Sequence, residues 1–254
     1  EHINIIAFSF DGKWLACGCW DNSISIWSVS SGALHKRLTG HGAEIRDLSF
    51  NHSGTLLASS SRDYTVRIWN FDSADEIERL YHGGIVQKAI FSPDDKSLAT
   101  ASWDRTVRLW DVAEIGNRLD LLDNNSNIST LTFSNDGSSM LFLSSDGKLK
   151  NWSFSGKPSI VSALPREIAH TVKVSPGGKS IAFTESPGNV ISLRDVDSNE
   201  VICKESLDES IITKTISRKS RVAVATNDLK ISIVTPVSCA VQSLAGKTRR
   251  TPYT

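Results

Sequence analysis

Short segments of alternating apolar and polar residues recur along the chain, and clusters of turn-forming residues separate them. One such segment is followed by the turn sequence Asn51-His52-Ser53-Gly54. Alternation with a period of two, bounded by Gly, Asn, Asp and Ser, predicts β-strands joined by tight turns. The four strands expected in this part of the chain are Glu44–Phe50, Thr55–Ser60, Thr65–Asn70 and Glu76–Tyr81.

The same order of strands is expected in the segment that follows. In both sets, two apolar strands precede an amphipathic strand and then a polar one. This order is typical of a sheet whose inner edge is buried and whose outer edge meets water. The second set comprises Ile85–Ser92, Ser97–Ser102, Thr106–Val112 and Arg118–Leu122.

A hexapeptide marks the repeat. Thr-Val-Arg-Ile-Trp-Asn at Thr65–Asn70 returns as Thr-Val-Arg-Leu-Trp-Asp at Thr106–Asp111. Related hexapeptides end at Ser28 and Ser153, and more divergent copies follow at Ile191–Asp195 and Ile231–Thr235. A period of about 40 residues with a Trp-Asp-like signature predicts an all-β propeller of four-stranded blades.

Four short motifs within the repeat resemble those of the WD-repeat family. They are Gly40-His41, Leu57-Ala58-Ser59, Asp63 and Trp69-Asn70. The resemblance covers nearly the whole chain. It implies a hydrogen-bonded relay of His, Ser or Thr, Asp and Trp that pins the strands of a blade. Such a relay suits the chemistry, because a buried indole N–H needs an acceptor and a carboxylate can orient an imidazole. The structural relay residues implied are His41, Ser59, Asp63 and Trp69 in one repeat, and His82, Thr100, Asp104 and Trp110 in the next.

The repeat predicts one propeller domain over residues 1–245 and a basic tail over 246–254. The expected blades span about 1–39, 40–81, 82–123, 124–164, 165–206 and 207–245. Two arrangements remain open, a six-bladed ring and a fragment of a seven-bladed ring. The sequence favours the fragment, because the chain starts without Met and stops on a basic, Pro-containing tail. A truncated blade would also explain why the first repeat lacks the Gly-His pair.

Composition narrows the function classes. The chain has 28 basic and 28 acidic residues, so no overall field attracts nucleic acid or anionic lipid. Basic residues cluster near the C-terminus without interleaved aromatics, which disfavours nucleic-acid binding. No apolar run approaches the roughly 18 residues that span a bilayer. An intracellular protein, cytoplasmic or nuclear and without a membrane partner, is expected.

The sequence contains no motif typical of a catalytic or cofactor-binding site. The histidines show no metal-ligand spacing, and no Gly-rich phosphate loop precedes a predicted helix. Ser, His and Asp recur together, but they recur at the repeat period, whereas an enzyme needs one convergent site. The sequence therefore predicts a non-enzymatic protein without metal or cofactor.

Binding candidates come from the turns. Trp20, Arg62 and Trp103 each precede the turn Asp of their repeat, and Glu44 and Ile85 begin innermost strands. The family resemblance implies that both classes lie on the upper propeller face. Trp and Arg are enriched at binding hot spots. The alternative is that each indole covers the edge of its own blade and stacks on Arg62 as a cation–π pair.

The favoured function is a scaffold or recognition module that binds a protein or peptide on the upper face within a multiprotein complex. One alternative is the WD-repeat sensor array of a larger NACHT-type signalling ATPase. Another, from a different class, is a propeller enzyme with its active site in the central channel, for which the sequence shows no cluster of acids or histidines.

Overall fold

The computed structural model describes the strand-forming part of the chain and most of its first three repeats. The described residues are 3–114, 118–122, 126–134, 136–154, 159–163, 168–174, 180–185, 190–195, 198, 200–206, 212–218, 221–226, 231–235 and 240–244. The expected basic tail, 246–254, lies outside them.

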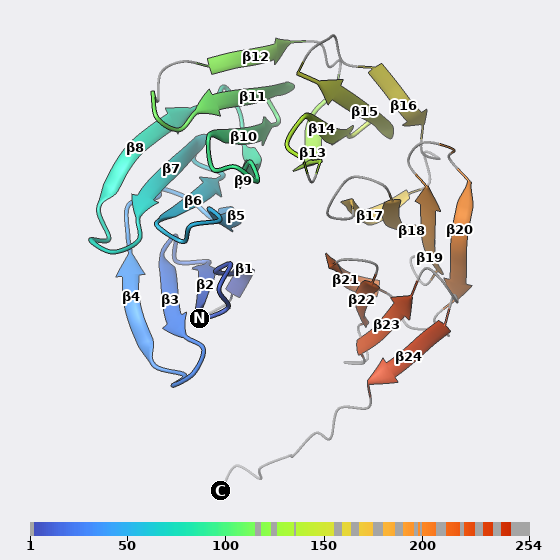
Figure 1. Cartoon of the computed structure of the whole chain (residues 1–254), viewed down its shortest axis with the longest axis horizontal. Coiled ribbons are helices and arrows are strands. Elements are labelled where there is room, and N and C mark those ends of the chain that lie inside the picture. Colours follow the sequence, from blue (N-terminus) through green and yellow to red (C-terminus); the bar gives the residue numbers. More distant parts are fainter. Residues whose placement is uncertain are drawn as a thin grey trace, which may run out of the picture. The chain divides into compact units, whose positions relative to one another are not determined.

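The described residues form 24 β-strands, arranged in six four-stranded sheets in which consecutive strands are neighbours (Figure 1). No helix in this part of the chain could cross a membrane. The strands of the first three sheets are β1 (Ile3–Phe8), β2 (Trp14–Cys19), β3 (Ile24–Ser28), β4 (Leu34–Leu38), β5 (Ile45–Phe50), β6 (Leu56–Ser61), β7 (Thr65–Asn70), β8 (Glu76–Tyr81), β9 (Val86–Phe91), β10 (Ser97–Ser102), β11 (Thr106–Asp111) and β12 (Arg118–Leu122). Those of the last three are β13 (Ile128–Phe133), β14 (Ser139–Ser144), β15 (Lys148–Ser153), β16 (Ser159–Ala163), β17 (Ile168–Val174), β18 (Ser180–Glu185), β19 (Val190–Asp195), β20 (Val201–Ser206), β21 (Ile212–Arg218), β22 (Arg221–Thr226), β23 (Ile231–Thr235) and β24 (Ala240–Leu244).

The chain divides into two compact units, Glu1–Pro158 and Ser159–Thr254. The first contains β1–β15. The second contains β16 and two complete antiparallel sheets, β17–β20 and β21–β24. Organisation as a single domain over residues 1–245 stays a prediction.

The turn between the first two strands of a sheet is fixed by a recurring local network. Ser9 Oγ donates to Asp11 at 2.6 Å and accepts from the backbone N–H of Trp14 at 3.0 Å. Ser92 and Ser134 make the same pair of bonds in the third and fourth sheets. The hydrogen bond from Ser9 and that from the Lys13 backbone lower the pKa of Asp11 to about 2.

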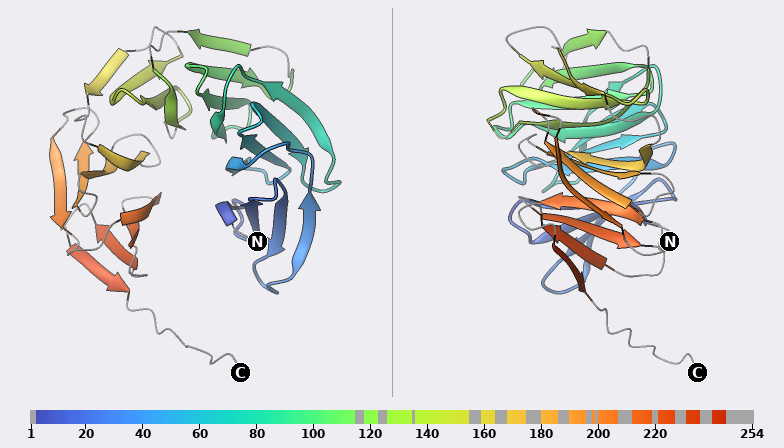
Figure 2. Two further views of the ribbon diagram at one scale, coloured as in Figure 1. Left: turned by 180° about the vertical axis from the view of Figure 1, so that it is seen from behind. Right: turned by 90° about the vertical axis from the view of Figure 1, so that its right-hand side faces the viewer.

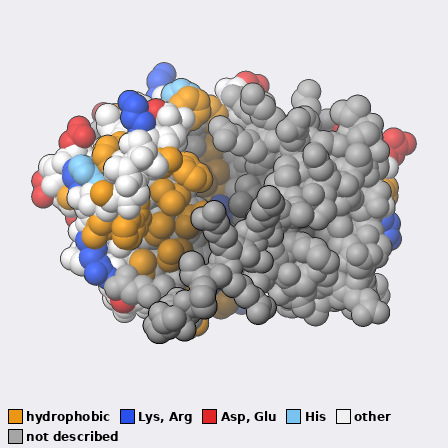
Figure 3. All heavy atoms as spheres, turned by 90° about the horizontal axis from the view of Figure 1, so that it is seen from below, with side chains coloured by type: hydrophobic (Ala, Val, Ile, Leu, Met, Phe, Trp, Pro, Cys, Tyr) orange, Lys and Arg blue, Asp and Glu red, His pale blue; other side chains and the backbone are white. Residues whose placement is uncertain are grey.

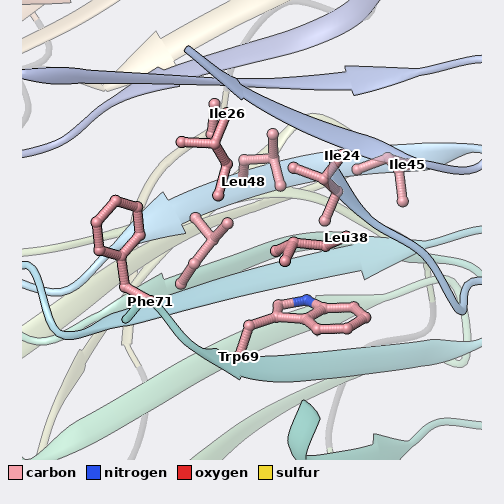
Figure 4. Close-up of a cluster of buried hydrophobic side chains, with 9 residues drawn as sticks. Ile24, Ile26, Leu38, Ile45, Leu48, Trp69 and Phe71 are labelled. Atoms are coloured by element: carbon pink, nitrogen blue, oxygen red, sulfur yellow. The ribbon is translucent and has the colours of Figure 1, made fainter. Parts of the chain in front are cut away.

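The core of the first unit lies between neighbouring sheets, which pack face against face (Figure 2). Figure 4 shows the first interface, where Ile24, Ile26 and Leu38 meet Ile45 and Trp69. Two further clusters join the second sheet to the third and the third to the fourth, and Trp110 and Trp152 occupy the place of Trp69. Each sheet therefore depends on its neighbours for the burial of its apolar faces.

Candidate functional site

Two buried hydrogen-bond networks recur in the chain. One links the strands of the second sheet, and the other links the strands of the third. The indole Nε1 of Trp69 donates to Ser59 Oγ at 2.8 Å, and Ser59 Oγ lies 2.7 Å from Nε2 of His41. His41 Nδ1 lies 2.7 Å from Asp63 Oδ2. In the third sheet, Trp110, Thr100, His82 and Asp104 repeat the arrangement at 2.9, 2.8 and 2.9 Å.

The proton positions follow from the chemistry of the groups. An indole N–H can only donate, so Ser59 Oγ accepts from Trp69 and directs its own proton to His41 Nε2. His41 Nδ1 then carries the ring proton and donates to Asp63. The same arrangement in the third sheet calls for a neutral imidazole. Burial lowers the pKa of His82, although the Asp104 carboxylate opposes the shift.

The turn aspartates are held ionised. Burial alone would raise the pKa of Asp63, but hydrogen bonds from His41 and Thr65 hold it well below its usual range. The backbone N–H of Gly42 adds a bond at 2.9 Å. The pKa of Asp104 is lowered in the same way. Sequence reasoning missed the threonine hydroxyls at 65 and 106, although their recurrence at the repeat period was visible.

Two arginines lie over the rings of the network tryptophans and were not among the sequence candidates. Arg67 is buried, lies 6.0 Å from the centre of the Trp69 ring and pairs with Glu76 at 2.5 Å. Arg108 lies 6.0 Å from the Trp110 ring and pairs with Asp104 at 3.4 Å. The signal that could have found them is the Arg two residues before Trp in both hexapeptides.

These networks are poor candidates for catalysis. Ser59 and Thr100 are fully buried, and each hydroxyl already bonds to an indole and an imidazole. A nucleophile needs access to substrate. Within the described residues, no group of three or more His, Cys, Asp or Glu side chains could hold a metal ion.

The binding candidates lie outside the networks. Trp20 and Trp103 are 62% and 45% exposed, whereas Trp69 and Trp110 are 3% and 5% exposed. Arg62 is also exposed, and Glu44 and Ile85 are half-buried.

Backbone hydrogen bonds bring the two classes of candidate together. The N–H of Arg62 donates to the carbonyl of Glu44 at 3.0 Å, and that of Trp103 donates to Ile85 at 2.8 Å. The turn that precedes β7 or β11 is therefore held against the start of the innermost strand of its own sheet.

Side chains extend this surface between sheets. The guanidinium of Arg62 lies 3.3 Å from the carboxylate of Glu44. Arg46 lies 3.2 Å from the same carboxylate and donates to Gln87 of the third sheet at 3.2 Å. Arg46 and Gln87 were not sequence candidates, because their contact joins two repeats and depends on the packing of the sheets.

A solved structure shares this fold. The β-propeller domain of Cps50 (Swd1) from Myceliophteria thermophila superposes with a TM-score of 0.81 at 17% identity, covering 96% of this chain and 87% of that one. The chain is a β-propeller protein.

Sequence comparisons match part of the chain to a known repeat. The model of the WD domain, G-beta repeat, matches residues 1–28, 32–70 and 77–111. The periodic tryptophan protein 2 homolog of Schizosaccharomyces pombe is 42% identical over 91 residues, which are 35% of this chain and 11% of that protein. The three matched segments, which together cover less than half of the chain, are similar to WD repeats.

Parts of the chain are also similar to two other proteins. The small ribosomal subunit protein RACK1y of Oryza sativa is 25% identical over 152 residues, 56% of this chain and 44% of that protein. The human NACHT domain- and WD repeat-containing protein 1 is 33% identical over 82 residues, 32% of this chain and 5% of that protein. The matches span less than half the length of each of these relatives.

Proposed function

We propose that the chain is a non-catalytic recognition module that binds a protein or peptide through Trp20, Arg62 and Trp103, flanked by Glu44 and Ile85. The observation that carries the proposal is the exposure of two indole rings in tight turns, while the indoles of the hexapeptides at Trp69 and Trp110 are buried. Exposed Trp and Arg side chains on a rigid β-scaffold are characteristic of binding hot spots.

The relatives support an intracellular, scaffold-type role. One of them is named as a protein of the small ribosomal subunit, which is a multiprotein particle. The similarity to that protein supports a protein or peptide as the partner here, and an intracellular location, cytoplasmic or nuclear.

A second candidate is the sensor array of a NACHT-type signalling ATPase. The match to the NACHT domain- and WD repeat-containing protein favours it. A Gly-x-x-x-x-Gly-Lys-Ser/Thr segment in the same polypeptide would distinguish this candidate from a free-standing scaffold.

The test is affinity capture with the intact chain and with the Trp20→Ala, Trp103→Ala double variant. The matched control is Phe10→Ala, because Phe10 is 67% exposed in the β1–β2 turn, at the opposite end of the strands from Trp20. Truncating a hot-spot Trp costs about 2 kcal/mol or more, roughly thirtyfold in affinity. We expect the double variant to lose partner binding at unchanged stability and the control to retain it. A double variant that loses folding but binds normally per folded molecule would contradict the proposal.

A further inference from the structure

The turn before the third strand of each of the first four sheets contains one residue in the left-handed backbone conformation. In the first and fourth sheets this residue is Asn22, with a φ of 67°, and Gly147, with a φ of 82°. In the second and third sheets it is Tyr64, at 70°, and Arg105, at 71°. Asn and Gly adopt this conformation readily, whereas a long or aromatic side chain is strained there. The second and third sheets therefore carry strained residues where the other two do not, and such strain is typical of functional positions.

The side chains at the two strained positions make no contact that would offset the strain. Tyr64 is 50% exposed, and Arg105 is also exposed. Among the described residues, neither side chain has a hydrogen bond, an ion pair or a ring contact. The same holds for Trp103, which precedes Arg105 by two residues in the same turn. Three side chains of the kinds enriched at binding hot spots are thus available to a partner.

Backbone without side chains lies between the two strained turns. The connection from β8 to β9 passes there, because the N–H of His82 donates to the carbonyl of Tyr64 at 2.9 Å and that of Gly83 donates to the carboxylate of Asp104 at 2.9 Å. A Cβ at Gly84 would lie 2.9 Å from the backbone nitrogen of Asp104, so this close approach requires glycine. Gly83 is exposed. A ligand can therefore reach the backbone between the turn of the second sheet and that of the third.

The charge left unbalanced on this surface is positive. One carboxylate, that of Glu44, is shared by Arg46 at 3.2 Å and Arg62 at 3.3 Å. Arg105 adds a guanidinium that has no acidic partner among the described residues. The turn aspartates of the second and third sheets are only 14% and 10% exposed, and their carboxylates already accept several hydrogen bonds. Charge is mixed on the side of the molecule that Figure 3 shows, where positive and negative side chains of the described residues are interspersed. A ligand would therefore be selected by the local arginines.

We propose that the surface formed by Arg62, Tyr64, the Gly83–Gly84 connection, Trp103 and Arg105 binds an acidic segment of a partner protein or peptide. A guanidinium binds a carboxylate through paired, charge-assisted hydrogen bonds. Exposed Tyr and Trp rings supply rigid contact area at a low cost in conformational entropy. The proposal rests on the proposed binding function, and it adds the chemistry of the ligand and two contact residues, Tyr64 and Arg105.

An array of short peptides of acidic, neutral or basic composition tests the proposal on the intact 254-residue chain. Dissociation constants of the retained peptides are then measured by fluorescence anisotropy. We expect the acidic peptides to be retained in preference to the others, with an affinity that falls as salt is added. Arg105→Asn should weaken their binding about tenfold, because it removes a charge-assisted hydrogen bond. Arg105→Lys keeps the charge without the paired donors and should have an intermediate affinity.

The test separates binding from stability. Tyr64→Asn and Arg105→Asn install the residue type that the first sheet has at this position, so they relieve strain in the turn. Both variants should bind about tenfold more weakly while their urea midpoints equal or exceed that of the intact chain. The matched control is Ala74→Gly. Ala74 also has a positive φ, 66°, but it lies in the β7–β8 turn at the opposite end of the strands, so this variant should keep full affinity.

Several results would overturn the proposal. Retention of no acidic peptide would do so, as would equal or tighter binding of neutral or basic peptides, or of oligodeoxythymidine added as a competitor. Unchanged affinity in Tyr64→Asn and Arg105→Asn, with weaker binding in Trp103→Ala, would overturn it and leave the proposed function standing. Unchanged affinity in Trp103→Ala as well would contradict both.

Discussion

The carboxylate of Asp104 accepts hydrogen bonds from His82, Gly83 and Thr106, whereas Asp146, at the same turn position in the fourth sheet, bonds locally to Ser144 and Lys148. Asp104→Ala leaves a buried imidazole without its acceptor. Loss of such a partner costs on the order of 1–3 kcal/mol. We expect Asp104→Ala to lower the urea midpoint clearly more than Asp146→Ala. Equal midpoints would contradict the structural role of the network.

The buried imidazoles also predict how stability depends on pH. Burial lowers the pKa of His82 below its ordinary value of 6.5, while the unfolded chain titrates near that value. Below about pH 6.5 the unfolded state therefore binds a proton at this imidazole more readily than the folded state does. The free energy of unfolding decreases as the pH is lowered through this range. Replacement by Gln removes this contribution, so His82→Gln should flatten the dependence of the unfolding free energy on pH between about 5 and 7. An unchanged slope in denaturation series across this range would refute the prediction.

At the scale of elements, the alternation of residues predicted which strands exist and how they are ordered. Thr65–Asn70, Glu76–Tyr81, Ser97–Ser102 and Arg118–Leu122 have the expected bounds. Other ends differ by one residue, as in β6, which runs from Leu56 to Ser61 instead of from Thr55 to Ser60. The difference arises because side-chain bonds fix the ends, such as the one from the Leu56 N–H to Asn51 Oδ1 at 2.9 Å.

Ile3 and Ile45 occupy the same repeat position in β1 and β5, yet the exposed fraction is 56% for Ile3 and 0% for Ile45. Truncation of a fully buried Ile removes packing and leaves a cavity, at about 2–5 kcal/mol. Ile45→Ala should therefore destabilise the 254-residue chain far more than Ile3→Ala, measured by chemical denaturation. Similar losses of stability for the two variants would mean that Ile3, like Ile45, is buried in solution.

At the scale of the whole chain, the repeat predicted an all-β propeller, because the WD-repeat hexapeptides are local in sequence. Burial of one face could not be predicted in this way, since Trp27 and Trp69 stand in similar hexapeptides and differ in the sheet that packs on them. The contact between Arg46 and Gln87 was missed for the same reason, because it joins two sheets. Local pattern identifies the strands, and non-local packing decides which side chains remain available for partners.

Nearest-neighbour packing also predicts a gradient of local stability. The second and third sheets contain the two complete networks and pack on a sheet at each face. The first sheet has exposed apolar residues such as Ile3, and the corresponding segments at Ile191–Asp195 and Ile231–Thr235 lack the Trp. In repeat arrays, stability is approximately a sum of such local and interface contributions. Native-state hydrogen exchange should therefore be slowest in β6, β7, β10 and β11, and faster in β2, β3, β19 and β23. Uniform protection across these strands would show that the chain unfolds as one cooperative unit, in which the two complete networks give no local advantage.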